Sequence, residues 1–166
     1  MTKSETFVFE ALPQNVEELK SLPEASLSTP YQAAALTVLS LCRFEDNQQE
    51  AVDMLNFLGG PQPLSNYDVQ FLSDRLTGKG YKPFSFFHGA KPENGYTPML
   101  PYQITVFDGP YSFQEDGYAK IMISSSGADS PREIKLREKP SSGEWFLWEN
   151  YLLADIRIPQ ADDPWA

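Results

Sequence analysis

Residues 132–159 read REIKLREKPSSGEWFLWENYLLADIRIP, in which alternating apolar residues stand on both sides of a Pro-Ser-Ser-Gly break. Period-two alternation around a turn-forming break predicts an antiparallel strand pair with a third strand following it. In the middle strand, Trp145 and Leu147 point to one face while Phe146 and Trp148 point to the other. Because both faces then carry large apolar side chains, we expect this strand, with Trp148, to lie inside the fold.

The rest of the second half of the chain continues this pattern. Turn-forming residues divide five predicted strands, which are Tyr102–Phe107, Tyr118–Ser124, Glu133–Glu138, Glu144–Tyr151 and Ala154–Ile158. Short links between successive strands favour a mainly antiparallel meander.

The first half reads as helical. Capping residues, prolines and three- to four-residue apolar spacing predict four helices, at Val16–Leu22, Pro30–Phe44, Gln48–Leu58 and Asn66–Thr77. The second of these is apolar nearly all round, so we expect it to be central. Helices followed by strands give an α+β fold, which we expect as one domain, residues 1–166, with a helical half (1–78) packed on a sheet half (102–166).

Residues 79–101 join the two halves and show no regular period. Glycines and prolines interrupt every candidate element, yet the segment carries five aromatic residues, too many for a solvated linker. Long loops of this kind are uncommon and tend to be functional or packed on a core. We therefore expect an ordered aromatic loop that crosses the body of the domain.

Composition excludes several classes of partner. Thirteen basic and 23 acidic residues give a net charge of −10, which opposes binding to nucleic acid and to anionic membranes. The single cysteine, Cys42, and the absence of a glycosylation sequon or a secretory signal indicate a cytoplasmic protein.

No pattern for catalysis is recognisable. His88 is the only histidine, and the common hydrolase, nucleotide-binding and metal-binding motifs are absent. The acidic pairs stand beside Gly, Ser or Pro, where carboxylates usually make turns. The sequence predicts no catalytic residue, no metal site and no cofactor, with an enzyme that uses these carboxylates as a lesser alternative.

Two weak candidates for ligand binding remain. Ser124–Arg132, with Asp129 and Arg132, has the small hydroxyls and the arginine of an anion cradle, although a strand connection needs the same residues. Tyr96 and Trp148 can line an apolar ligand pocket, although core packing is the commoner use of such residues.

Four strings carry a resemblance to a known family. They are GPQPLS at 60–65, GAKPENGYTP at 89–98, SGADSPR at 126–132 and DPWA at 163–166. With them the chain resembles an uncharacterised bacterial family, a domain of unknown function. The resemblance implies a single-domain bacterial protein and supplies no activity or site residue.

These observations leave two hypotheses of function. The first is a non-catalytic bacterial cytoplasmic domain that binds a protein partner. The alternative is a small-ligand-binding domain whose pocket lies where residues 79–101 meet the sheet around Trp148. An exposed apolar patch would favour the first hypothesis, and a closed aromatic pocket would favour the second.

Overall fold

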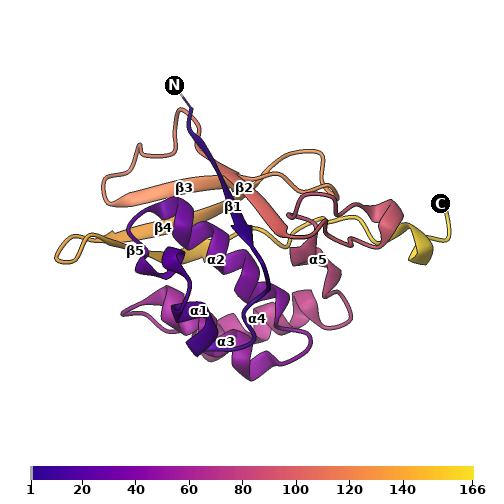
Figure 1. Ribbon diagram of the computed structural model, residues 1–166, viewed down its shortest axis with the longest axis horizontal. Coiled ribbons are helices and arrows are strands. Elements are labelled where there is room, and N and C mark those ends of the chain that lie inside the picture. Colours follow the sequence, from indigo (N-terminus) through magenta and orange to yellow (C-terminus); the bar gives the residue numbers. More distant parts are fainter. Residues whose placement is uncertain (1) are drawn as a thin grey trace.

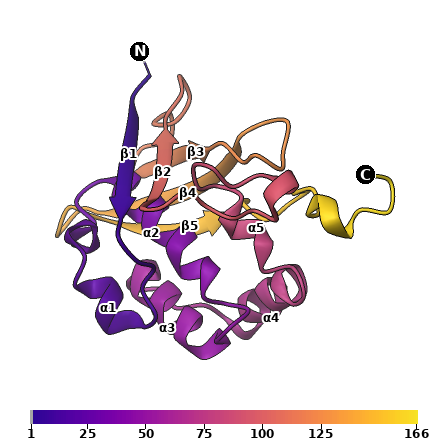
Figure 2. The ribbon, with the colours of Figure 1, turned by 45° about the vertical axis from the view of Figure 1, so that its right-hand side comes forward.

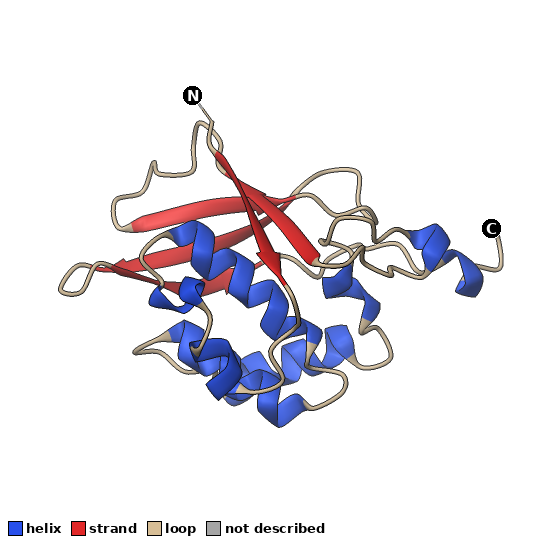
Figure 3. Ribbon diagram, in the orientation of Figure 1, coloured by secondary structure: helices blue, strands red, loops and turns tan. Residues whose placement is uncertain are grey.

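The computed structural model describes residues 2–166, which form one five-stranded sheet with five α-helices gathered on one side of it (Figures 1 and 3). The strands follow the order β1-β2-β3-β4-β5, and all neighbours are antiparallel. Their bounds are Ser4–Phe9, Tyr102–Phe107, Tyr118–Ile123, Arg132–Lys139 and Glu144–Asn150. The helices α1 to α5 span Val16–Lys20, Pro30–Cys42, Gln48–Gly59, Asn66–Leu76 and Tyr81–Phe84. The predicted α+β class is confirmed.

The N-terminal half is not purely helical as predicted, because β1 begins at residue 4 and forms one edge of the sheet. Phe7 and Phe9 of β1 are buried against the core, while Val8 points to solvent. Thr6 and Thr105 are 99 residues apart in the chain, yet their hydroxyls lie 2.7 Å from each other across β1 and β2. A strand with so distant a partner leaves no turn signal beside it, which explains why it was missed.

The predicted strand at Ala154–Ile158 is wrong, because the ladder ends with β5 at Asn150. Asp155 has a φ of 54°, which lies outside the extended region and breaks the run. The segment instead crosses the β3–β4 connection, where the Arg157 N–H donates to the Gly127 carbonyl at 2.9 Å.

Helix α2 is the centre of the fold, as its apolar circumference predicted. Twelve of its 13 residues are buried. The Thr29 hydroxyl caps its first turn by accepting the Gln32 N–H at 3.2 Å, and Pro30 occupies the first turn. Figure 2 shows α2 beneath the sheet, with α1, α3 and α4 farther from the strands. The core therefore has the sheet on one side of α2 and the remaining helices on the other.

The segment 79–101 packs on the body of the domain. It contains the one-turn helix α5 and a short 3₁₀ turn at Pro92–Asn94, and Phe86, Phe87 and Tyr96 are buried. The Tyr81 and Tyr96 rings stack with centroids 5.5 Å apart, and the Phe87 ring meets the Tyr102 ring of β2 edge-on at 5.5 Å. The aromatic content that argued against a solvated linker is thus used in packing.

Trp148 is not the core residue that the sequence indicated. It is half-buried, and it does not belong to the set of side chains packed against the core, whereas Trp145, Phe146 and Leu147 do. Strand β5 is the far edge of the sheet, so its second face needs less cover than a central strand would.

None of the helices within residues 2–166 is long and apolar enough to span a membrane.

Candidate functional site

A β-bulge places Trp148 in an unusual position on the edge strand. Lys135 lies opposite Glu149 and Leu136 lies opposite Leu147, so Trp148 has no partner on β4. Such an extra residue bends the strand and redirects its side chain. The Trp148 ring meets the Tyr118 ring edge-on, with centroids 5.8 Å apart.

The free edge of β5 retains backbone groups that no strand covers. The Trp145 N–H points away from β4 and donates to the Leu27 carbonyl at 2.8 Å, whereas the Tyr151 N–H points toward β4 and donates to the Glu133 carbonyl at 2.9 Å. Such directions alternate along an antiparallel ladder, and the bulge at Trp148 shifts the alternation by one residue. Counted from Trp145 and from Tyr151 respectively, the backbone N–H groups of Leu147 and Asn150 face the free edge. Within residues 2–166 neither backbone N–H donates a hydrogen bond outside the sheet.

A groove runs along this edge, between β5 on one side and the α3–α4 turn with α4 on the other. We call it the β5 groove. Its two adjoining stretches have volumes of about 240 and 270 Å³ and share Gly59, Gln62, Leu147 and Trp148. Trp148 therefore stands between the two stretches. No residue of 79–101 lines either one, so the groove lies elsewhere than the pocket suggested from the sequence.

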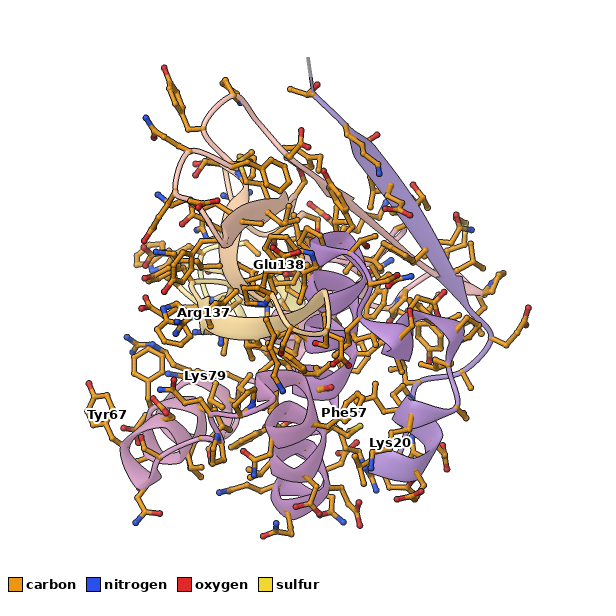
Figure 4. All side chains as sticks on the ribbon, turned by 90° about the vertical axis from the view of Figure 1, so that its left-hand side faces the viewer. Lys20, Phe57, Tyr67, Lys79, Arg137 and Glu138 are labelled. Carbon is orange, nitrogen blue, oxygen red and sulfur yellow. The ribbon has the colours of Figure 1, made fainter. Side chains whose placement is uncertain are left out.

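One stretch of the groove is rich in exposed aromatic side chains. Tyr67 and Phe71 of α4 are 77% and 39% exposed, and Tyr151 after β5 is 50% exposed. The spacing of four residues places Tyr67 and Phe71 on one face of α4, while Leu72 and Leu76 of the same helix are buried in the core. Figure 4 shows Tyr67 projecting from α4 below β5, with Arg137 above that strand. Helix α4 thus presents a second apolar surface to solvent.

Gly60 sets how closely the α3–α4 turn approaches β5. Its φ of 61° lies in the region that favours glycine, and a Cβ atom there would lie 2.6 Å from the Phe146 ring. Asn56 Oδ1 accepts the Leu64 N–H at 2.8 Å across the same turn. The wall of the groove opposite β5 is therefore held by backbone geometry that only glycine fits without strain.

The charges of the groove differ between its two ends. At the aromatic end, Asp68 accepts the Ser65 N–H at 2.9 Å in a capping box, and Glu149 accepts a hydrogen bond from the Tyr151 hydroxyl. This hydrogen bond to Glu149 raises the pKa of the Tyr151 hydroxyl. Both carboxylates therefore already have donors.

The other end of the groove carries two cations, Arg137 and Lys139, and one acid, Glu138. The Arg137 guanidinium carbon lies 4.7 Å from the Trp148 ring centre and 5.5 Å from that of Tyr118. The two ion pairs among residues 2–166 are Lys135–Glu115 and Arg157–Asp129, so Arg137 belongs to neither. An arginine stacked on aromatic rings keeps its N–H fork available for an anion.

Three of the four residues singled out from the sequence meet around the C-terminal segment instead of the groove. The Tyr96 hydroxyl donates to the Arg157 carbonyl at 2.5 Å, and Asp129 pairs with the Arg157 guanidinium at 2.9 Å. Arg132 donates to the carbonyls of Ala154 and Asp155 at 2.8 and 3.2 Å. Tyr96 and Arg132 thus hold residues 154–157, and Trp148 alone lies in the β5 groove.

Other reactive side chains are occupied or buried. His88 Nε2 lies 2.8 Å from the Thr105 hydroxyl, and burial raises the pKa of the Cys42 thiol. Burial also lowers the pKa of Lys82, whose ammonium donates to the Leu153 carbonyl at 3.0 Å. Within residues 2–166 no group of three or more His, Cys, Asp or Glu side chains is arranged so that it could hold a metal ion.

Sequence reasoning missed Tyr67, Phe71, Tyr151 and Arg137 as members of the site. A signal for the first two was present, because α4 carries more apolar residues than the face with Leu72 and Leu76 requires. No comparable signal marks Arg137, since its position over Trp148 depends on the bulge in the neighbouring strand.

Comparison with known proteins identifies the family. Residues 11–160 match the family described as a domain of unknown function (DUF6935), and the chain belongs to it. No curated protein and no solved structure matches the chain.

Proposed function

We propose that this DUF6935 domain binds an extended segment of a partner protein in the β5 groove, as an added strand beside β5. The observation that carries the proposal is the coincidence of a free strand edge with a groove lined by Tyr67, Phe71, Trp148 and Tyr151. In strand addition, the main chain supplies hydrogen bonds and alternate side chains enter pockets. The uncovered amide groups of Leu147 and Asn150 and the aromatic lining meet these two requirements.

The kind of residues in the groove supports a macromolecular partner. Exposed aromatic side chains are enriched at protein interfaces, where they contribute most of the binding energy. A long uncovered strand edge is otherwise a risk for aggregation, and natural proteins usually blunt such edges. The bulge at Trp148 is one such device and the contact of the Trp145 N–H with the Leu27 carbonyl is another, but the backbone N–H groups of Leu147 and Asn150 stay uncovered beside the aromatic groove.

The shape of the groove supports an extended segment as its occupant. It consists of two adjoining stretches of about 240 and 270 Å³ instead of one deep pocket. The two stretches lie end to end along β5 and share Trp148, which suits a ligand that passes over both. We extend the proposal to a setting in the bacterial cytoplasm, which the free and buried Cys42 thiol supports.

A displayed library of random 12-residue peptides tests the proposal. We expect selection on the wild-type domain to yield peptides whose binding is lost in the double variant Tyr67→Ala/Tyr151→Ala. Both side chains are exposed, so this variant should remain folded. The matched control is Tyr111→Ala/Phe113→Ala, which removes two aromatic residues that are 70% and 50% exposed but lie outside the groove.

Amide hydrogen exchange then separates strand addition from binding through side chains alone. We expect a bound peptide to slow exchange at the Leu147 and Asn150 amides, because the added strand would accept hydrogen bonds from them. Peptides that bind both double variants equally, or that leave these two amides unprotected, would contradict the proposal.

A further inference from the structure

The cationic end of the β5 groove specifies the chemistry of the bound segment. From the position of Arg137 we infer that the partner segment carries an aspartate or glutamate whose carboxylate pairs with the Arg137 guanidinium. This inference rests on the proposed function, since it concerns an occupant of the same groove.

The first argument is the preorganisation of Arg137. Its guanidinium carbon lies 4.7 Å from the Trp148 ring centre and 5.5 Å from the Tyr118 ring centre, although the residue is exposed. Contact with two rings restricts the side chain, so a bidentate pair with a carboxylate costs less side-chain entropy than one made by a mobile surface arginine. The rings hold the cation without neutralising it.

The second argument is that the nearby acids leave Arg137 unpaired. Lys135, on the same face of β4, forms an ion pair with Glu115, in which Lys135 Nζ lies 2.9 Å from Glu115 Oε2. Glu138, which lines the same stretch, points to the opposite face of β4, and neither ion pair found among residues 2–166 includes it. Glu149 and Asp68, in the other stretch of the groove, already accept hydrogen bonds from Tyr151 and Ser65. A cation that has aromatic support but no acid partner is complementary to an acid brought by a ligand.

The third argument is the charge pattern of the surrounding surface. Lys135, Arg137 and Lys139 share one face of β4. On the neighbouring strands, Lys135 lies opposite Glu149 and Lys139 lies opposite Glu144, whereas Arg137 lies opposite Tyr118 and Phe146. Arg137 is therefore the cation of this row that has no acid directly across from it, which leaves it to attract an acid of a ligand.

The test uses the peptides whose binding requires Tyr67 and Tyr151. We expect them to share an aspartate or glutamate at one fixed position, and we expect Arg137→Gln to weaken their binding roughly tenfold to a hundredfold. Replacing that acid by its amide should weaken binding to wild type by a similar factor and have little further effect on the Arg137→Gln variant. The matched control is Lys20→Gln, which removes a cation stacked at 5.5 Å on Phe57 (Figure 4), outside the groove.

Failure of the inference differs from failure of the proposed function. Peptides that need Tyr67 and Tyr151 but show no common acid, or that bind the Arg137→Gln variant as tightly as wild type, would overturn the inference and leave the groove as a peptide site. If no selected peptide needs the two tyrosines, the proposed function itself fails.

Three further measurements assign the site to another occupant if the inference is wrong. In the first, the acid of a selected peptide is replaced by phosphoserine, and binding more than tenfold tighter than that of the glutamate peptide would overturn the inference. Labelled single-stranded DNA or RNA would overturn it by binding at low micromolar concentration near physiological salt in an Arg137-dependent way. Sedimentation of wild type would overturn it by revealing a dimer that Arg137→Gln abolishes. We expect none of these three results.

Discussion

The Tyr31 hydroxyl donates a 2.5 Å hydrogen bond to Asp108 Oδ2, across 77 residues of chain and inside the protein. The other oxygen of Asp108 accepts the Lys3 N–H at 2.8 Å, and the Asp108 N–H donates to the Lys3 carbonyl at 2.9 Å. One carboxyl group therefore joins the central helix α2 to the end of β2 and to the residue that precedes β1. Beside the backbone ladder between β1 and β2, this junction links the start of β1 to the central helix.

Tyr31→Phe removes the hydroxyl and leaves the Asp108 oxygen buried without that donor. We expect the free energy of unfolding to fall by about 1–3 kcal/mol, the usual cost of such a loss. Urea denaturation measures this change. Tyr67→Phe is the control, since Tyr67 is exposed and its variant should unfold at the wild-type midpoint.

The same pair predicts a dependence of stability on alkaline pH. Burial, and then the hydrogen bond to Asp108, raise the pKa of the Tyr31 hydroxyl above its usual value. The folded state therefore holds this proton more tightly than the unfolded state, in which tyrosine ionises near pH 10, at about its usual pKa. The stabilisation is complete below that pH and is lost as pH rises toward the folded-state pKa. Between about pH 9 and 11, wild type should lose more stability than Tyr31→Phe; parallel curves for the two proteins would contradict this expectation.

The sequence predicted those parts of the fold that local signals determine. Caps and turns located the starts of α1 to α4 and of β2, β3 and β5 at the residues where the structure has them. The missed strand β1 depends on pairing with residues about a hundred positions away, for which a short segment carries no signal. The expected last strand fails at one residue, Asp155, whose positive φ no alternation pattern reports.

The site was less predictable than the fold. Tyr96 and Arg132 were chosen as aromatic and cationic residue types, but their roles depend on where residues 154–157 return. Trp148 was expected in the core, but its partial exposure follows from a bulge and from the position of β5 at the sheet edge. Both facts concern the register of two strands, which a single strand does not encode.

Arg132→Ala should loosen the C-terminal segment, because the Arg132 guanidinium donates to the carbonyls of Ala154 and Asp155. We expect faster amide exchange at Arg157, whose N–H donates to Gly127, and a loss of about 1–3 kcal/mol in the free energy of unfolding. Asp129→Ala breaks only an exposed ion pair with Arg157 and should change stability by less than about 1 kcal/mol. Equal effects of the two substitutions would refute the structural role of Arg132.

Gly60→Ala should strain the α3–α4 turn, since its φ is 61° and the new Cβ would lie 2.6 Å from the Phe146 ring. We expect a loss of about 1–3 kcal/mol, with the turn displaced from β5. Gly78→Ala has a similar φ of 72° but no atom within 4 Å of its Cβ, so it isolates the backbone cost. If both variants lose equal stability, the contact between Gly60 and Phe146 does not constrain the groove.

Trp148→Ala tests whether the tryptophan belongs to the core or to the groove. Truncating a fully buried tryptophan typically costs about 3–5 kcal/mol, but Trp148 is half-buried. Of its aromatic and cationic neighbours, Tyr118 is half-buried and Arg137 is exposed. We expect a loss of less than about 2 kcal/mol, because only part of the apolar area of the side chain is removed from water. Leu136→Ala, at a fully buried position on β4, serves as the reference and should cost about 2–5 kcal/mol. Urea denaturation of the two variants decides between the two assignments. A loss for Trp148→Ala equal to that for Leu136→Ala would show that Trp148 is a core residue, whereas a small loss would support a role for its half-buried ring in contacting a ligand in the β5 groove.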